Sequence, residues 1–222
     1  MVGTGIGPGQ LTVEARAAIT AADRVFYLVG DLLTEHHIQG LAPVATSLGA
    51  CYGEDGPGRD AYERMAEAIL APARAGERVC AAFYGHPGVF VLPSGEAISR
   101  ARSEGIEARM LPAVSALDCL FADLGVDPAS SGLQTYEAGD FLRRRPVIEP
   151  RAGLVLWQVG VLESVDALAA ALGETYPHGH SLVVYEASPY PGVAPRTDPV
   201  PLGDLGDAKL SQRSTLYVAP LP

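Results

Sequence analysis

The sequence predicts an α/β protein of two domains. Short apolar runs alternate with segments whose apolar residues recur at helical spacing, and glycines or prolines separate one segment from the next. Such a strand–helix alternation is typical of a mostly parallel sheet covered by helices. With 222 residues, of which 48% are hydrophobic and 19% charged, the chain is long and apolar enough to bury a core of this kind.

The first predicted domain covers residues 1–126 and begins with a glycine-rich loop. The loop leads to Thr12, which we expect to cap a helix that ends near Ala21. The elements predicted after it are a strand over Val25–Val29, a helix over Asp60–Ala73, a strand over Val79–Tyr84, a helix capped by Ser94 that ends near Glu104, a strand over Ile106–Leu111 and a helix over Ser115–Leu124.

The second predicted domain covers residues 127–222. It follows a polar stretch at Val126–Gly132 that reads as a linker, because proline, serine and glycine replace the apolar pattern there. The elements predicted beyond it are strands over Leu133–Glu137 and Leu154–Val159, a helix over about Ser164–Leu172, a strand over Ser181–Glu186, a proline-rich stretch over Pro189–Pro201, a short helix near Asp204–Leu210 and a last strand over Thr215–Ala219.

Charge and composition argue against several classes of partner. The formal net charge of −10 disfavours a surface for nucleic acid or an anionic membrane, since both require positive charge. All apolar runs are far shorter than the roughly 20 residues of a membrane-spanning helix, and no basic-then-apolar leader is visible. Cys51, Cys80 and Cys119 form no Cys-x-x-Cys pair, so we expect reduced thiols and a cytoplasmic location.

Two loops are candidates for ligand binding. The spacing in Gly3–Gly9 is G-x-G-x-G rather than the dinucleotide pattern G-x-G-x-x-G, so on its own it is equally consistent with a tight turn. The block Phe83–Phe90 directly follows a predicted strand and therefore lies at the carboxyl end of that strand, where open α/β sheets bind ligands. Judged only from this pattern, His86 is a turn histidine bonded to the backbone.

These loops and the segment Met110–Ala116 stand in the order found in tetrapyrrole methylases, which the chain resembles over nearly its whole length. Within that superfamily it is most similar to the borosin α-N-methyltransferases, which methylate backbone amides of a ribosomal peptide. The segments that carry the resemblance are Gly3–Ile6, Val25–Tyr27, Phe83–Val91, Arg109–Val114, Ser115–Leu124, Tyr136–Ala138, Asp140–Leu142 and Trp157–Gly160.

The resemblance implies two α/β domains of the tetrapyrrole-methylase type, also called class III methyltransferases, with S-adenosylmethionine in the cleft between the domains. Loops at the carboxyl ends of strands in both domains are then expected to contact this cofactor, and no metal is expected. The residues implied as cofactor-binding are Tyr84, His86, Val89, Phe90, Ser115, Ala116 and Gln158.

The resemblance also implies catalytic residues. Tyr52 and Tyr62 stand ten residues apart, as in the family pattern, and Tyr84 completes the set of phenols. Arg59 departs from the pattern because it is one place closer to Tyr62 than the family arginine, and a loop through Gly56–Gly58 would have to absorb the difference. Without the resemblance, Tyr62 reads equally well as a core residue and Arg59 as a solvated charge.

Amide methylation gives these residue types a chemical role. An amide nitrogen is a poor nucleophile because its lone pair is delocalised into the carbonyl, so methylation proceeds more easily from an imidate-like form. A phenolate can accept the amide proton, although a free phenol has a pKa of about 10. An adjacent arginine favours the phenolate, and a hydrogen-bond donor aimed at the amide oxygen stabilises the imidate.

The resemblance suggests which partners to expect. Fused relatives carry their core peptide as a C-terminal tail, whereas this sequence stops at Val218–Pro222, so we expect a split borosin system with a separate ribosomal precursor peptide. We also expect a homodimer, as is common for this fold. The alternatives are a small-molecule or tetrapyrrole methyltransferase and a non-catalytic peptide-binding relative. The shortage of Lys and Arg disfavours an anionic tetrapyrrole as substrate.

Overall fold

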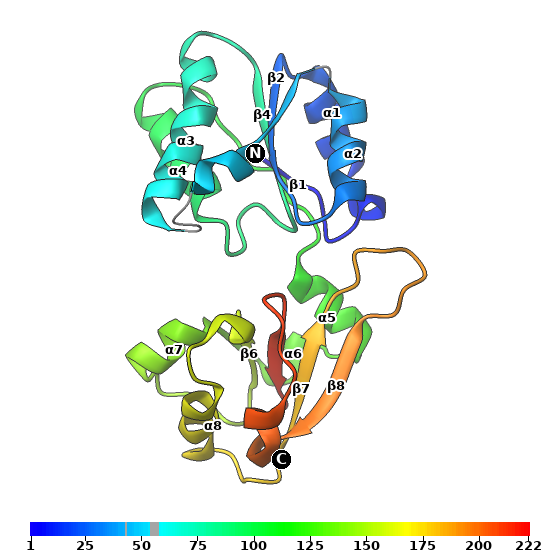
Figure 1. Ribbon diagram of the computed structural model, residues 1–222, viewed down its shortest axis with the longest axis vertical. Coiled ribbons are helices and arrows are strands. Elements are labelled where there is room, and N and C mark those ends of the chain that lie inside the picture. Colours follow the sequence, from blue (N-terminus) through cyan, green and yellow to red (C-terminus); the bar gives the residue numbers. More distant parts are fainter. Residues whose placement is uncertain (43, 54–57) are drawn as a thin grey trace. The chain divides into compact units, whose positions relative to one another are not determined.

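A computed structural model describes residues 1–42, 44–53 and 58–222 (Figure 1). The chain divides into two compact units. The first comprises Met1–Asp118 with Pro189–Val193, and the second comprises Cys119–Ser188 with Ala194–Pro222. The division falls inside helix α5 (Ala116–Leu124), whereas the boundary predicted between residues 126 and 127 remains a sequence-based prediction.

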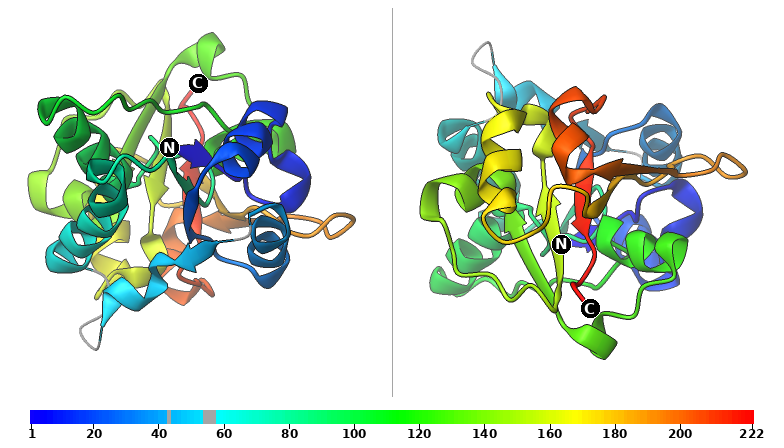
Figure 2. Two further views of the ribbon diagram at one scale, coloured as in Figure 1. Left: turned by 90° about the horizontal axis from the view of Figure 1, so that it is seen from above. Right: turned by 90° about the horizontal axis from the view of Figure 1, so that it is seen from below.

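The first unit contains a four-stranded, fully parallel sheet in the order β1-β4-β2-β3. Helices α1 and α2 lie on one side of this sheet and α3 and α4 on the other (Figures 1 and 2). The elements are β1 (Val2–Gly3), η1 (Pro8–Gln10), α1 (Val13–Ala21), β2 (Arg24–Leu28), α2 (Leu32–Leu41), β3 (Ala45–Ser47), η2 (Leu48–Tyr52), α3 (Arg59–Arg74), β4 (Val79–Phe83) and α4 (Leu92–Ser103).

Alternation along the strands explains why both faces of the sheet are covered. On β2, Val25 and Tyr27 pack with α1 and α2, whereas Phe26 packs with α3, because neighbouring side chains of a strand point to opposite faces. Both faces are therefore apolar, as expected for a parallel sheet buried between two layers of helices.

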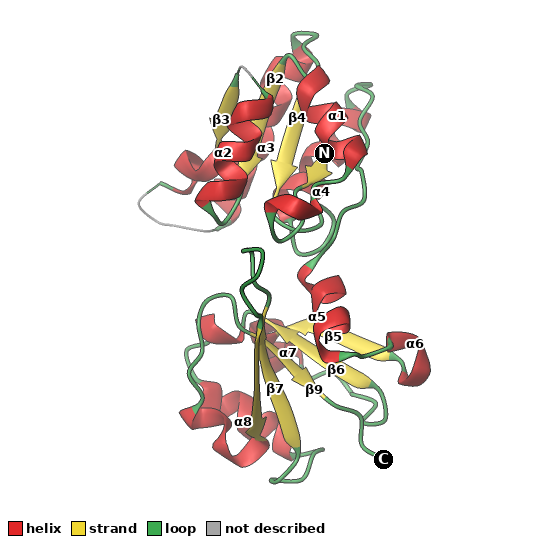
Figure 3. Ribbon diagram, turned by 90° about the vertical axis from the view of Figure 1, so that its right-hand side faces the viewer, coloured by secondary structure: helices red, strands yellow, loops and turns green. Residues whose placement is uncertain are grey.

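The second unit contains a mixed five-stranded sheet in the order β5-β6-β9-β7-β8, with only β5 and β6 paired in parallel (Figure 3). Its core lies on the face that α7 and α8 cover. The elements are α6 (Pro128–Ser131), β5 (Leu133–Glu137), α7 (Ala138–Arg144), β6 (Gly153–Trp157), η3 (Val159–Val161), α8 (Val165–Gly173), β7 (Ser181–Glu186), β8 (Arg196–Pro201), η4 (Leu202–Asp207) and β9 (Thr215–Val218).

Several sequence-based predictions about secondary structure are wrong. Helix α6 lies in the expected linker Val126–Gly132, and β8 lies in the proline-rich stretch Pro189–Pro201. The segment Ile106–Leu111 is not a strand: its pairing is limited to Met1, whose ammonium donates to Arg109 and whose carbonyl accepts from Leu111. The helix predicted to start at Ser94 starts two residues earlier, so Ser94 lies inside α4, fully buried, and does not cap it. Among the described residues, no helix is long and apolar enough to cross a membrane.

Candidate site at the carboxyl edge of the first sheet

Two loops meet where β1 and β4 end. The amide N–H of Gly85 donates to the carbonyl of Gly5 at 2.9 Å, and the Thr4 amide donates to the carbonyl of Phe83 at 2.9 Å. A Cβ added at Gly3 would lie 2.1 Å from the Gly85 carbonyl oxygen, closer than any side chain allows. The glycine loop therefore has at least one structural purpose, which is to let the two backbones approach.

The loop after β4 contains the predicted cofactor residues His86, Val89 and Phe90. The imidazole of His86 accepts a hydrogen bond from the Gly88 amide at its Nδ1, 2.9 Å away, which confirms the backbone bond predicted from the pattern. Because Nδ1 accepts, a neutral His86 carries its proton on Nε2. Val89 and Phe90 are 38% and 55% exposed, so they present apolar surface at this edge.

Phe90 has a left-handed backbone, with φ of 60°. A bulky side chain rarely adopts this conformation, and it persists only where the surrounding structure imposes it. The strain is found beside the exposed apolar side chains, as is common at ligand-binding loops.

Ser115 and Ala116 begin α5. The Ser115 hydroxyl and amide both donate to Oδ2 of Asp118, each at 2.6 Å, and the Asp118 amide donates to the Ser115 hydroxyl at 3.3 Å. This reciprocal pattern is a capping box, which satisfies amides at the helix start. Because the capping bonds already engage both the hydroxyl and the amide of Ser115, we expect the backbone of Ala116 to be the part available to a ligand.

Gln158 belongs to the second unit and follows β6 directly. Its φ of 56° is left-handed, and it precedes the short helix η3. The carboxyl end of β6 therefore also carries a strained, polar residue.

The predicted tyrosines also lie at the carboxyl edge of the first sheet. Tyr52 ends η2, which follows β3, and Tyr62 lies in the first turn of α3. Both side chains pack against the core cluster that contains Met65 and Phe83. Burial, with a smaller contribution from the nearby Tyr62, raises the pKa of Tyr52 above its usual range, so Tyr52 keeps its proton at neutral pH. Tyr84 follows β4 directly and is half-buried.

The guanidinium of Arg59 pairs with a carboxylate on its own helix. Its Nε donates to Glu63 at 3.2 Å, one turn along α3, and its side chain is 87% exposed. The family resemblance predicts Arg59 beside the tyrosine pair. Gly56 and Pro57, which would absorb the difference of one position, lie outside the described residues.

Arg64 contacts the segment that carries Tyr52, although nothing in the sequence predicts this contact. Its Nε and Nη2 both donate to the carbonyl oxygen of Cys51, at 3.0 and 2.9 Å, immediately before Tyr52. No residue pattern signals such a contact, because every residue offers the same backbone carbonyl.

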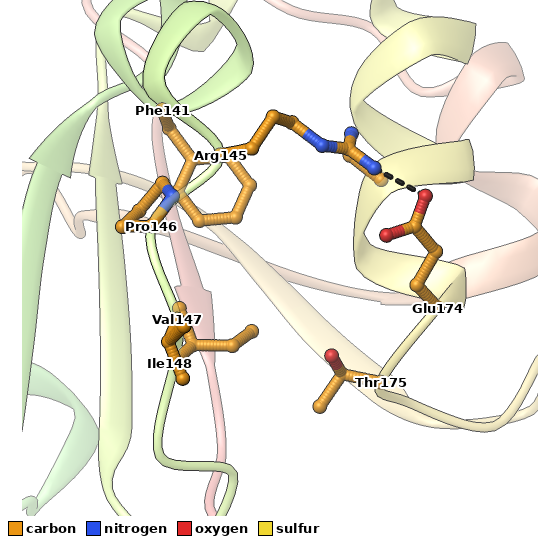
Figure 4. Close-up of a pocket in the computed structure, with 8 residues that line it drawn as sticks. Phe141, Arg145, Pro146, Val147, Ile148, Glu174 and Thr175 are labelled. Atoms are coloured by element: carbon orange, nitrogen blue, oxygen red, sulfur yellow. Dashed lines mark hydrogen bonds and ion pairs between the residues drawn. The ribbon is translucent and has the colours of Figure 1, made fainter.

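A separate pocket of about 170 Å³ lies in the second unit, between the ends of α7 and α8 (Figure 4). Arg145 and Glu174 form an ion pair across it, and Phe141 and Val147 contribute apolar surface. None of the predicted site residues lines this pocket. No cluster of His, Cys, Asp or Glu suited to a metal ion occurs within residues 1–42, 44–53 and 58–222.

Comparison with known proteins finds related sequences and structures. Residues 1–190 match the model of the "Tetrapyrrole (Corrin/Porphyrin) Methylases". The chain is 41% identical to a "methyltransferase/ribosomally synthesized cyclic peptide dendrothelin A precursor" of Dendrothele bispora and 40% identical to the corresponding omphalotin A precursor of Omphalotus olearius. Both alignments cover 99% of this chain but 57% of the relative, so the chain spans just over half the length of these relatives.

Solved structures share the fold. A uroporphyrin-III C-methyltransferase of Thermus thermophilus, in complex with S-adenosyl homocysteine, superposes with a TM-score of 0.72 at 21% identity. The superposition covers 98% of this chain and 95% of the other. A cobalt precorrin-4 methyltransferase gives a TM-score of 0.72 at 17% identity, over 98% and 93% of the two chains.

Proposed function

We propose a function for this chain, which belongs to the tetrapyrrole methylase family. Membership makes it an S-adenosylmethionine-dependent methyltransferase, and the proposal is that it methylates backbone amide nitrogens of a ribosomal peptide. The observation that carries the proposal is the pair of adjacent phenols, Tyr52 and Tyr62, at the carboxyl edge of the first sheet. The peptide-precursor relatives support the same choice of substrate.

The residues of the β4 loop fit a nucleoside-containing cofactor. The exposed apolar surface of Val89 and Phe90 suits a flat adenine ring and a thioether chain, and backbone groups at the start of α5 suit its polar atoms. When bound, S-adenosylmethionine supplies a methyl group on a positively charged sulfur. We propose that Tyr84, His86, Val89, Phe90, Ser115, Ala116 and Gln158 bind it.

The chain's own residues must then activate the amide. The amide N–H has to lose its proton as the N–CH₃ bond forms, and negative charge collects on the carbonyl oxygen. Because burial keeps Tyr52 protonated, we propose that it donates a hydrogen bond to this oxygen rather than acting as the base. Tyr62 or Tyr84, present as its phenolate, then accepts the proton and becomes a neutral phenol, and the guanidinium of Arg59 remains a candidate for stabilising that phenolate before the transfer.

A peptide assay tests the proposal. The purified chain is incubated with S-adenosylmethionine and synthetic peptides encoded by the small reading frames beside its gene, and tandem mass spectrometry locates any added methyl groups. Methyl groups on backbone nitrogens support the proposal. Methylation of side chains alone, or of added uroporphyrin and no peptide, refutes it. Supplying the peptide as a separate molecule also tests the expectation of a split system, which stays a prediction.

We also propose that the chain forms a homodimer. Large apolar side chains are exposed on the first unit, including Val13 at 87% and Leu32 at 81%, and such residues are typical of surfaces that associate. Light scattering at micromolar concentration should give twice the mass of the chain, and a monomer at every concentration would refute the proposal.

A further inference from the structure

We propose that Arg64 is a positioning residue, which holds turn η2 against helix α3 and thereby places Tyr52 beside Tyr62. This inference rests on the proposed function, because Tyr52 is given a role in methyl transfer there. The contact that carries it is the pair of hydrogen bonds from Nε and Nη2 of Arg64 to the carbonyl oxygen of Cys51, at 3.0 and 2.9 Å.

The anchor of this contact is rigid. Arg64 lies on α3 immediately before Met65, which is fully buried, and Ile69 one turn further is 4% exposed. A guanidinium donates through a fixed fork, so two bonds to one oxygen restrict the direction as well as the distance of the carbonyl. The contact therefore ties η2 to a helix that the core already holds in place.

The two ends of η2 are held in different ways. At its start, Leu48 is 1% exposed and the Ser47 hydroxyl accepts a hydrogen bond from the Gly49 amide at 3.2 Å. At its end, the chain turns at Gly53, whose φ of 64° is left-handed, and the Arg64 contact immediately precedes Tyr52. Apolar packing thus holds both ends of the turn, and at its end, where the phenol lies, Arg64 adds two directed hydrogen bonds.

The position of Tyr52 matters because proton and charge transfer depend steeply on geometry. A misplacement of about 1 Å can cost on the order of 10²-fold in rate. Neither Arg59, which pairs with Glu63, nor the apolar packing around Leu48 directs the carbonyl of Cys51. Arg64 adds to this packing two hydrogen bonds that link α3 directly to the backbone of the segment that carries Tyr52.

The test compares Arg64→Ala with a matched control. Arg102→Ala removes another exposed arginine whose Nε donates to a backbone carbonyl, that of Ala108, at 3.0 Å and on a different helix. We expect Arg64→Ala to lower kcat for peptide methylation about 10- to 100-fold, with the KM for S-adenosylmethionine within about threefold of the parent. Arg64→Lys should recover only part of the loss, and Arg102→Ala should keep the parent's kcat.

A double-mutant cycle distinguishes positioning from general destabilisation. If Arg64 acts through Tyr52, the double variant with Arg64→Ala and Tyr52→Phe should be no slower than Tyr52→Phe alone. If the two losses multiply, Arg64 does not act through Tyr52 and the inference is wrong. Parent-like kcat in Arg64→Ala overturns it as well.

Hydrogen exchange separates this inference from the proposed function. Amide exchange over residues 48–53 should be at least several-fold faster in Arg64→Ala than in the parent, and unchanged in Arg102→Ala. Should the parent methylate no peptide, the proposed function fails and this exchange result alone decides whether Arg64 holds the turn. Unchanged exchange in Arg64→Ala overturns the inference in either case.

Discussion

The carboxyl edges of the two sheets differ in whether their side chains are exposed or engaged in hydrogen bonds within the fold. In the first unit all four strands are parallel, so every strand sends its following loop to the same edge, and exposed apolar side chains such as Phe90 remain there. In the second unit the strands are mixed, and Glu186 at the end of β7 already accepts bonds from Ser211, Ser214 and Arg196. We therefore expect the first edge to receive a ligand, whereas the hydrogen bonds at Glu186 stabilise the fold.

The largest expected effect comes from replacing two tyrosines at the carboxyl edge of the first sheet. Tyr62→Phe and Tyr84→Phe should each lower methyl transfer on the order of 10²- to 10³-fold, because each removes a group that accepts the proton or stabilises charge. Calorimetric affinity for S-adenosylhomocysteine should stay within a few-fold. Melting temperature is measured on the same samples, since a residue that only packs would lower stability by about 1–3 kcal/mol without a selective loss of rate. Parent-like turnover by both variants would mean that the imidate mechanism is wrong.

The next effect tests whether the glycine loop is structural. Gly3→Ala places a Cβ 2.1 Å from the Gly85 carbonyl oxygen, and backbone cannot move aside cheaply, so we expect a loss of about 3 kcal/mol in unfolding free energy. Gly9→Ala is the matched control in the same loop, because a Cβ there meets nothing within 4 Å. It should be neutral or stabilise by up to about 1 kcal/mol. Equal melting temperatures for the two variants would contradict this account.

A third prediction concerns Glu186, which lies at the end of β7 in the second sheet. Burial alone would raise the pKa of Glu186, but hydrogen bonds from Ser214, Ser211 and Arg196 outweigh it and hold the pKa below its usual range. Glu186→Gln should therefore cost about 1–3 kcal/mol at pH 7. Because the folded-state pKa is lowered, this stabilisation is present above the unfolded pKa of about 4.3 and is lost as the pH falls through the folded value.

Thermal unfolding of the parent and Glu186→Gln from pH 3 to pH 8 measures this difference. The gap should be largest near neutrality and close below about pH 4. Glu174→Gln is the matched control, since Glu174 pairs with Arg145 but is 67% exposed, and its effect should stay within about 0.5 kcal/mol. A constant gap at every pH would show that the carboxylate charge is not what stabilises this edge.

Much of the fold follows from periodicity. The strand predicted over Ser181–Glu186 matches β7 residue for residue, because a continuous run of apolar and β-branched residues with turn signals at both ends marks it. Edge strand β8 was missed because Pro199 and Pro201 argue against a strand, and a proline is tolerated only where one side of the strand is unpaired. The segment Ile106–Leu111 begins with the apolar–polar alternation of a strand, but its neighbour β1 is only two residues long.

The candidate site likewise contains residues that the sequence predicts and one that it does not. The pattern located Tyr84 and His86, because a strand followed by glycine and proline predicts a loop at the carboxyl edge of the sheet. Arg64 left no signal, since its partner is a backbone carbonyl thirteen residues away and the contact depends on how η2 folds against α3. Side-chain contacts to distant backbone are set by tertiary structure, which the local pattern does not encode.

The smallest expected effect concerns Arg59. Its ion pair with Glu63 spans one turn of α3 and is largely exposed, so Arg59→Ala should change unfolding free energy by no more than about 0.5 kcal/mol. In this arrangement its guanidinium is directed to a carboxylate and not to a phenol, so the loss of kcat should be less than about tenfold, well below that of Tyr62→Phe. Glu63→Gln is the control, because it frees the guanidinium while keeping the charge of Arg59. A loss of 10² or more in Arg59→Ala with parent-like Glu63→Gln would show that Arg59 leaves Glu63 when substrate binds and serves the tyrosine pair. The family's arginine role would then stand despite the shift of one position, and the open edge of the first sheet would include the start of α3.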